Sequence, residues 1–130
     1  MYFIIITILM LQKLLQNEEW EQINKLIKKN KLDLNKPIHN GNTLMHYACV
    51  KNNNAVRNIL KQNQSMLYKV NKDGDTCIHL LCNYGNDVKI VKDILTSFPA
   101  LRFLKNKKGK TVIDLLHDNE ELQKWYMTTF

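Results

Sequence analysis

The residues with the most chemical potential in this chain are two histidine–cysteine pairs of identical spacing. His46 is followed three residues later by Cys49, and His79 is followed in the same way by Cys82. Two imidazoles and two thiolates form a ligand set that zinc accepts, and a thiol beside an imidazole is also a nucleophile with its base. The pattern therefore raises a metal-binding or redox site as a hypothesis, and the elements that position the four residues must decide it.

Both pairs belong to a sequence that repeats along the chain. The segment Thr43-Leu44-Met45-His46 follows Asn40-Gly41-Asn42, and 33 residues later Thr76-Cys77-Ile78-His79 follows Asp73-Gly74-Asp75. The same frame returns at Lys108-Gly109-Lys110-Thr111, where Asp114 takes the place of the histidine. A short match arises by chance more easily than a shared helix pattern does. The segments between the motifs therefore provide the stronger test.

Three apolar stripes with helical spacing lie between the motifs. The stripe Val56-x-x-Ile59-Leu60 is matched by Val91-x-x-Ile94-Leu95 and by Ile23-x-x-Leu26-Ile27, and each stripe ends 16 residues before a motif threonine. Apolar residues at positions i, i+3 and i+4 form one face of a helix. The repeat therefore extends beyond the motif, and it includes a first unit that has no Thr-x-x-His of its own.

A period of about 33 residues with a T-P-L-H-x-A motif is typical of ankyrin repeats, and this chain resembles that family over roughly residues 10 to 126. The resemblance implies an all-α fold, an ankyrin-repeat solenoid of stacked helix-turn-helix units with short β-hairpin-like fingers. It predicts a single domain over residues 1–130. The expected units are a degenerate capping repeat at about 8–38, repeats at 39–71 and 72–106, and a C-terminal capping repeat at 107–126.

The motif residues have structural roles in this interpretation. Gly41, Gly74 and Gly109 are expected to adopt positive φ in tight turns, and Thr43, Thr76 and Thr111 to cap the following helices. By resemblance, His46 and His79 hydrogen-bond to the motif threonine and to neighbouring backbone, so that they tie the fingers together. The family usually has proline after the threonine, and here that position holds Leu44, Cys77 or Val112.

The ends of several helices are also predicted. Helices are expected to end in a left-handed residue at Asn30 and Asn63, and at Pro99 in the third unit. The first helix of the degenerate unit is expected from about Ile8 to Gln16, and its second helix from near Asn17. The polar segment 118–124 is expected to face water as a C-terminal cap.

The composition is that of a folded protein. The 130 residues carry 19 basic and 12 acidic side chains, a net charge of +7, and nearly all of the basic residues are lysine. This lysine bias resembles that of an A+T-rich genome, so codon usage accounts for part of the charge. Cys49, Cys77 and Cys82 are an odd set without disulfide-scaffold spacing. We therefore expect reduced thiols in a cytoplasmic protein, in the host cytoplasm if the source is a virus or an intracellular bacterium.

The opening run from Tyr2 to Leu11 is apolar except for Thr7. As a helix it reaches about 15 Å, half of a bilayer core, so it does not span a membrane. No basic residue precedes Lys13 and no alanine precedes Ala48, so the run lacks the features of a signal peptide. A capping helix is the expected role. Packing over the core, contact with a partner and contact with a membrane surface remain open for residues 1–7.

The repeat spacing argues against the metal hypothesis. Equivalent positions in consecutive ankyrin repeats lie about 10 Å apart, whereas a tetrahedral zinc site needs all four ligands within about 2.3 Å of the ion. The favoured interpretation places the histidines in the fingers and the cysteines as small buried residues. The four glycines are scattered singly, which excludes a phosphate-binding glycine loop. No metal, no cofactor and no catalytic residue is expected.

The run from Lys105 to Lys110 places four lysines on one expected finger. Such a patch attracts an acidic protein surface or a phosphate backbone. Nucleic-acid binding usually adds arginine and stacking aromatic residues, which this finger lacks. An acidic protein partner is therefore favoured over nucleic acid.

The expected function is non-enzymatic protein recognition by a monomer. By resemblance, the partner contacts the concave surface formed by the finger tips and the first helices. The expected contact residues are His39, Asn40, Asn42, Tyr47, Lys51, Lys72, Asp73, Asp75, Asn83, Lys107, Lys108 and Lys110. Two alternatives remain: a metal-binding or redox protein that uses the doubled His-x-x-Cys pattern, and a membrane-surface adaptor that uses the apolar N-terminus.

Overall fold

The computed structural model describes residues 2–84, 87–116 and 119–130, and it describes side chains from Ile8 onward. Within these ranges the chain is helical and contains no strand, which confirms the all-α class. The elements in chain order are α1 (Tyr2–Gln16), α2 (Trp20–Lys28), α3 (Leu44–Lys51), α4 (Asn53–Gln62), the 3-10 helix η1 (Gln64–Tyr68), α5 (Cys77–Tyr84), α6 (Val88–Ser97), the 3-10 helix η2 (Pro99–Phe103), α7 (Val112–Leu115) and α8 (Glu120–Thr129).

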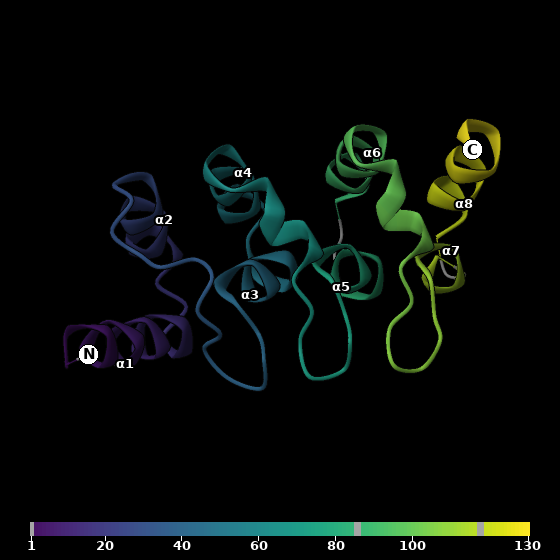
Figure 1. Ribbon diagram of the computed structural model, residues 1–130. Helices are drawn as coiled ribbons and strands as arrows, with labels where there is room; N and C mark the ends of the chain where they lie inside the picture. The colour runs from purple at the N-terminus through teal and green to yellow at the C-terminus, as the bar shows by residue number, and fades with distance from the viewer. Residues whose placement is uncertain (1, 85–86, 117–118) are drawn as a thin grey trace.

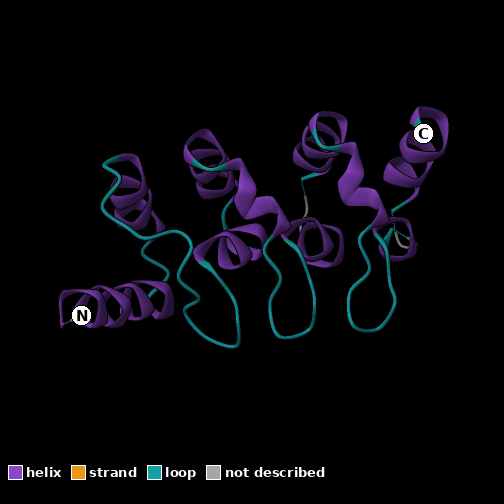
Figure 2. Ribbon diagram, viewed as in Figure 1, coloured by secondary structure: helices purple, strands orange, loops and turns teal. Residues whose placement is uncertain are grey.

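The helices are stacked in two rows. Figure 1 shows α3, α5 and α7 in one row and α4, α6 and α8 in the other, with α1 and α2 continuing the rows at the N-terminal end. The loops that contain the motif glycines project side by side from the row of first helices, as Figure 2 shows. The two termini lie at opposite ends of the stack. This is the arrangement of a solenoid, in which each unit contacts only its neighbours.

The apolar stripes face the interior as predicted. In the second helix of each pair most stripe positions are buried because they pack against the adjacent helices. Leu26 and Leu60 are half-buried at the edge of the same core. Burial of each large aliphatic side chain contributes about 1.5–3 kcal/mol. The fully or nearly fully buried stripe residues are Ile23, Ile27, Val56, Ile59, Val91, Ile94 and Leu95.

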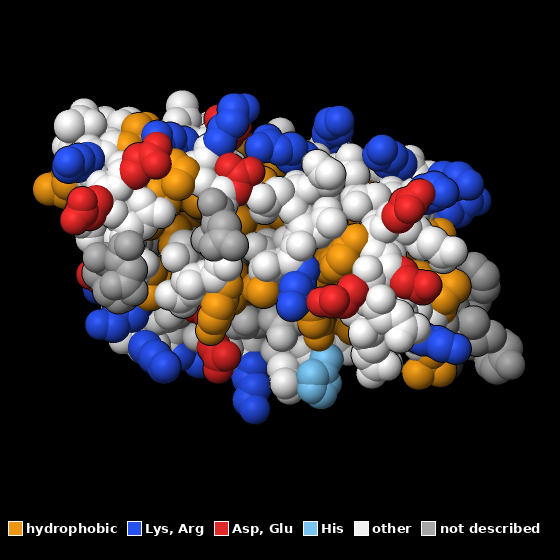
Figure 3. All heavy atoms as spheres, turned by 180° about the vertical axis from the view of Figure 1, so that it is seen from behind, with side chains coloured by type: hydrophobic (Ala, Val, Ile, Leu, Met, Phe, Trp, Pro, Cys, Tyr) orange, Lys and Arg blue, Asp and Glu red, His pale blue; other side chains and the backbone are white. Residues whose placement is uncertain are grey.

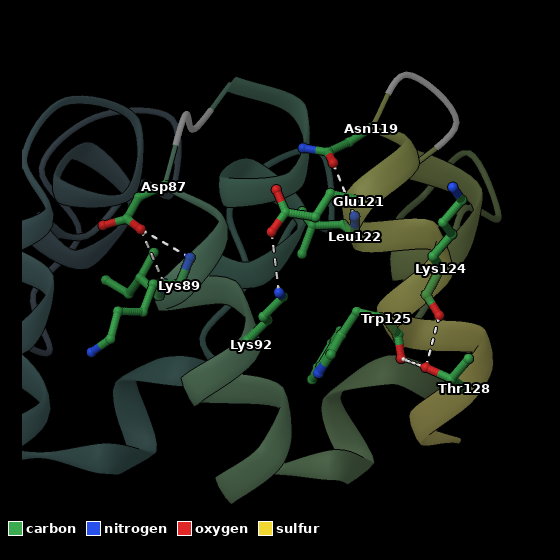
Figure 4. A network of polar contacts seen from close by, with 10 residues as sticks. Asp87, Lys89, Lys92, Asn119, Glu121, Leu122, Lys124, Trp125 and Thr128 are labelled. Atoms are coloured by element: carbon green, nitrogen blue, oxygen red, sulfur yellow. Dashed lines mark hydrogen bonds and ion pairs between the residues drawn. The ribbon is translucent and has the colours of Figure 1, made fainter.

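Polar contacts cap helices α6 and α8 and connect them to each other. The Asp87 carboxylate caps α6 by accepting a hydrogen bond from the Lys89 N–H at 2.9 Å, and the Asn119 side chain caps α8 in the same way. Lys92 of α6 pairs with Glu121 of α8 at 3.3 Å, which joins the last helix to the stack (Figure 4). In the polar segment expected to face water, Glu120 and Glu121 are exposed and Leu122 is buried, while Asp118 lies outside the described residues.

Three of the predicted helix ends were wrong. Helix α1 begins at Tyr2 rather than near Ile8, since no glycine or proline interrupts the apolar run. Helix α2 begins at Trp20 rather than near Asn17, because Glu18 adopts φ of 53° and turns the chain. Asn30 has the expected left-handed conformation, with φ of 55°, but Asn63 has φ of −153°. The Asn63 side chain instead caps η1 by accepting the Ser65 N–H.

The expectation of three reduced thiols was also wrong. Cys49 on α3 forms a disulfide with Cys77, the first residue of α5, with a Cα–Cα distance of 5.8 Å. Both residues are almost completely buried, and only Cys82 remains as a free thiol in the described part of the chain. Cys77 occupies the position at which the family usually has proline. The cross-link therefore joins the first helices of two consecutive repeats.

We expect the Cys49–Cys77 bond to stabilise the stack. It closes a loop with a sequence separation of 28 residues, so its reduction should lower the free energy of unfolding by about 3 kcal/mol. Urea unfolding with and without dithiothreitol measures this loss. Iodoacetamide labelling of the denatured chain should add one adduct before reduction and three after it. Three adducts before reduction would show that the disulfide is absent.

Candidate protein-binding surface

Three fingers project from the first helices, and each turns at a glycine. Gly41, Gly74 and Gly109 have φ of 74°, 75° and 75°, a conformation that residues with a Cβ rarely adopt. A Cβ on Gly41 would lie 2.9 Å from the Lys72 nitrogen of the second finger, and one on Gly74 would lie equally close to the Lys107 nitrogen of the third. A Cβ on Gly109 would meet nothing within 4 Å. The first two glycines therefore also allow neighbouring fingers to approach.

Backbone and side-chain amides join each finger to the next. The Lys72 N–H donates to the Asn40 carbonyl at 2.9 Å, and the Asn71 side-chain amide donates to the Asn42 side-chain oxygen at 2.9 Å. The equivalent bonds between the second and third fingers connect Lys107 N–H to the Asp73 carbonyl at 3.0 Å and the Asn106 amide to the Asp75 carboxylate at 2.9 Å. The fingers therefore form one hydrogen-bonded array.

The two histidines connect the helices to this array. His46 Nδ1 accepts the Thr43 backbone N–H at 3.0 Å, so its proton resides on Nε2, which donates to the Asp75 carbonyl at 3.0 Å. His79 makes the same contact with Thr76 at 3.1 Å, and its Nε2 lies 3.1 Å from the Leu104 carbonyl, just before the third finger, and 3.0 Å from the Lys110 carbonyl in that finger. These are the contacts that the resemblance implies. In the last unit Asp114 replaces histidine and accepts from the Thr111 N–H at 3.0 Å.

Burial changes the ionisation of two groups in the doubled His-x-x-Cys pattern. It lowers the pKa of His46 below its ordinary value near 6.5, although hydrogen bonds to the Asp75 and Lys69 backbone act in the opposite direction. Burial also raises the pKa of the Cys82 thiol to about 12. At neutral pH His46 is therefore uncharged and Cys82 is a protonated thiol, which is a poor nucleophile and a poor metal ligand.

The pattern does not assemble a ligand set. Cys49 is bonded to Cys77, which lies outside the pattern, and both nitrogens of His46 are used by the finger array. Among the described residues, no group of three or more histidine, cysteine or acidic side chains is placed to hold a metal ion. The chemical role of these residues is therefore to connect consecutive repeats.

We call the surface formed by the fingers (residues 37–42, 71–75 and 106–110) and by helices α3 and α5 the finger surface. At its N-terminal end lies a groove of about 450 Å³, between the end of α1, the first finger and α3. Its apolar lining comes from four half-buried side chains, two of them aromatic. They are Leu15, Trp20, Ile38 and Tyr47.

Polar groups form the rim of this groove. Lys51 on α3 pairs with Glu18 at 3.5 Å, and both side chains are more than half exposed. The Gln12 amide donates to the Ile38 carbonyl at 3.2 Å, so α1 is attached to the first finger. Burial raises the pKa of Tyr47, so its hydroxyl remains protonated and can donate a hydrogen bond. An apolar hollow with a polar rim is the common anatomy of a protein-binding site.

The predicted contact residues separate into three groups. His39, Tyr47 and Lys51 line the groove. Asn42 and Asp75 are half-buried, and their side chains bind the neighbouring finger. The others are exposed on the fingers or at the end of α5, and none of their lysines forms an ion pair within the described part of the chain. These exposed residues are Asn40, Lys72, Asp73, Asn83, Lys107, Lys108 and Lys110.

Sequence reasoning missed the half of the groove that precedes the first motif. Gln12, Leu15 and Gln16 come from α1, while Glu18 and Trp20 come from the turn and the start of α2. No motif points to them, because the first repeat is degenerate. The only available signal was a tryptophan, Trp20, near the start of the second expected helix.

Stacked helix pairs joined by threonine–histidine fingers define a repeat protein of the solenoid class. The family model for ankyrin repeats in three copies matches residues 9–101. The chain belongs to the ankyrin repeat family, whose members are protein-interaction modules.

A solved structure provides a further comparison. A chain in the structure of the Bd0816 predatory endopeptidase from Bdellovibrio bacteriovorus in complex with the immunity protein Bd3460 matches this fold with a TM-score of 0.71. The two chains are 24% identical, and the match covers 89% of this chain but 61% of that chain. Identity at this level shows the fold alone. No curated protein matches this chain.

The close approach of the fingers predicts unequal effects of two matched substitutions. Gly109→Ala should cost about 1 kcal/mol of unfolding free energy, because only the left-handed backbone is strained. Gly41→Ala should cost about 3 kcal/mol, because its Cβ would also lie only 2.9 Å from the Lys72 backbone nitrogen and would displace that backbone. Urea unfolding of both variants measures the difference. Equal losses would contradict the role given to the contact between fingers.

The lowered pKa of His46 predicts loss of stability in mild acid. The unfolded chain binds a proton at His46 near pH 6.5, whereas the folded chain does so only at lower pH. The His46 contribution is therefore complete above about pH 6.5 and is lost as the pH falls through the folded pKa. Unfolding free energies measured from about pH 7 to pH 5 should fall less steeply in His46→Gln. An unchanged slope in His46→Gln would refute this explanation.

Proposed function

We propose that this chain is a non-enzymatic protein-interaction module whose partner binds the finger surface. The observation that carries the proposal is the groove of about 450 Å³ between α1, the first finger and α3. Its lining combines tryptophan, tyrosine, leucine and isoleucine with a rim of amides and charges. Tryptophan and tyrosine dominate the binding energy of many interfaces because they bury a large area and keep a polar group for hydrogen bonding.

The groove suits an apolar anchor from the partner. Its volume lies within the range of about 300–1,000 Å³ that small ligand sites occupy, which is space for one or two large side chains. The polar groups at the rim, Lys51, Glu18 and Gln16, would lie beside the backbone of a segment inserted into the groove. A leucine, methionine or phenylalanine is therefore the expected anchor.

The rest of the finger surface favours an acidic segment. Lys107, Lys108 and Lys110 are exposed on the third finger, and Lys72 is exposed on the second. The first and third fingers are two repeats apart, which corresponds to roughly 20 Å at a packing distance of about 10 Å per helix. An extended peptide covers that span with about six residues. The proposed ligand carries its apolar anchor about six residues from a group of aspartates or glutamates.

Selection from a displayed library of random peptides tests this proposal. Peptides that bind the native protein should be enriched in a large apolar residue that lies about six residues from a group of aspartates or glutamates. The double variant Tyr47→Ser, Lys51→Glu should weaken the binding of the enriched peptides at least tenfold, which corresponds to about 1.4 kcal/mol. Lys108→Glu should weaken the binding more at low salt than at high salt.

The matched control is Lys61→Glu, an exposed charge reversal on the outer helix α4. It should leave peptide binding unchanged. The proposal fails if the enriched peptides lack the apolar anchor, or if Lys61→Glu abolishes their binding while the Tyr47 and Lys51 variant retains it.

A further inference from the structure

The outer side of the first helix pair presents a second surface, away from the finger groove. In α1, Leu11 and Leu14 are buried, but Leu9 and Met10 are 60% and 44% exposed. Gln12, Leu15 and Gln16 of the same helix belong to the finger groove. Met10 and Leu14, about one helical turn apart, lie on another side of α1. Helix α1 therefore contributes to two different surfaces, and the exposed Leu9 lies between them.

A hollow of about 280 Å³ lies between α1 and α2 on this outer side. Met10 and Leu14 from α1 and Leu26 from α2 form its apolar part, and Lys25 and Lys29 stand beside them. No acidic residue lines it. Figure 3 shows hydrophobic, basic and acidic side chains at this end of the molecule, on the right of the view. The surface therefore combines exposed apolar groups with positive charge.

The charge extends along the second half of α2. Residues 22–31 contain four lysines and no acidic residue. Lys25 pairs with Glu21 at 3.7 Å, but the two side chains are 65% and 88% exposed. Solvent therefore screens this ion pair, and Lys25 can exchange Glu21 for another anion. Lys13 is exposed in the last turn of α1. Cations therefore flank the apolar side chains on both helices.

We propose that this outer surface of α1 and α2 binds the surface of an anionic lipid bilayer. Apolar side chains beside lysines are the combination that lies at the boundary between acyl chains and anionic headgroups. The 15 residues of α1 reach about 22 Å, less than the roughly 30 Å of a bilayer core. No helix among the described residues is long and apolar enough to cross a membrane. In this proposal α1 lies along the bilayer surface.

Charge distinguishes a bilayer from a second copy of the chain. A two-fold dimer through this surface places the same patch on both sides of the interface. Lys25 and Lys29 of one copy would then meet the lysines of the other in a partly desolvated contact, which is unfavourable. Phosphatidylserine headgroups neutralise the same lysines. Binding in this mode leaves the finger surface free, so the module would hold its protein partner at a membrane.

Vesicle flotation of the full chain tests the proposal. The protein should float with vesicles of phosphatidylcholine and phosphatidylserine, and it should not float with phosphatidylcholine alone. The double variant Leu9→Glu, Met10→Glu should reduce the partition coefficient at least tenfold, and Lys29→Glu should reduce it severalfold in a salt-dependent way. Because Leu9 and Met10 are exposed, circular dichroism and thermal unfolding should be unchanged.

Two matched controls complete the experiment. Met127→Glu changes a side chain that is 71% exposed at the opposite end of the stack, and Lys108→Glu changes a lysine on the third finger. Both should float like the wild-type protein. Absence of flotation with phosphatidylserine vesicles overturns the proposal, as does equal flotation of the Leu9 and Met10 variant. A dimer in sedimentation experiments that this variant disrupts, without vesicle binding, would assign the surface to a second copy.

Discussion

The structure depends on the contact between consecutive repeats, because no single helix pair can bury its own apolar face. The second-helix stripes, represented by Ile23, Val56 and Val91, are buried only because another pair lies against them. The fingers also depend on contact between consecutive repeats, in this case through hydrogen bonds. A backbone N–H of each finger donates to a carbonyl of the preceding one, and His46 donates to the next finger from within the helix that it helps to cap. In the third finger, a Cβ on Gly109 would meet no atom within 4 Å. Apolar and polar contacts therefore specify the same register between units.

The doubled His-x-x-Cys pattern shows how repetition imitates a chemical motif. Its spacing is constant because each copy occupies the same place in a repeat, and the distance between repeats keeps the copies from forming one site. The disulfide does not join members of this pattern, because Cys49 bonds to Cys77 of the next unit. This bond removes the argument for a reducing compartment that the odd number of cysteines suggested. The cytoplasmic location therefore remains a prediction without support from the thiols.

Both proposed surfaces lie where the repeat rule is broken. The first unit has no Thr-x-x-His, and α1 meets the first finger through the Gln12 contact instead of through a histidine. The groove lined by Trp20 and Tyr47 lies on one side of α1, next to this Gln12 contact. On the other side of α1, Met10 is exposed beside the hollow between α1 and α2. Departures from a local rule are commonly found at functional positions. The degenerate first unit therefore contributes residues to both proposed surfaces.

Features that depend on neighbouring residues in the chain were predictable from the sequence alone. The period, the helical stripes, the threonine caps and the positive φ of Gly41, Gly74 and Gly109 belong to this group, because each is decided within a few residues and is repeated several times. The family's recurring contacts also placed His46 and His79 correctly among the fingers. The pairing of Cys49 with Cys77, the groove that joins α1 to the first finger, and the conformation of Asn63 were decided only by the tertiary structure. They depend on which distant residues approach one another in space, and a single sequence records the residue types but not the distances between them.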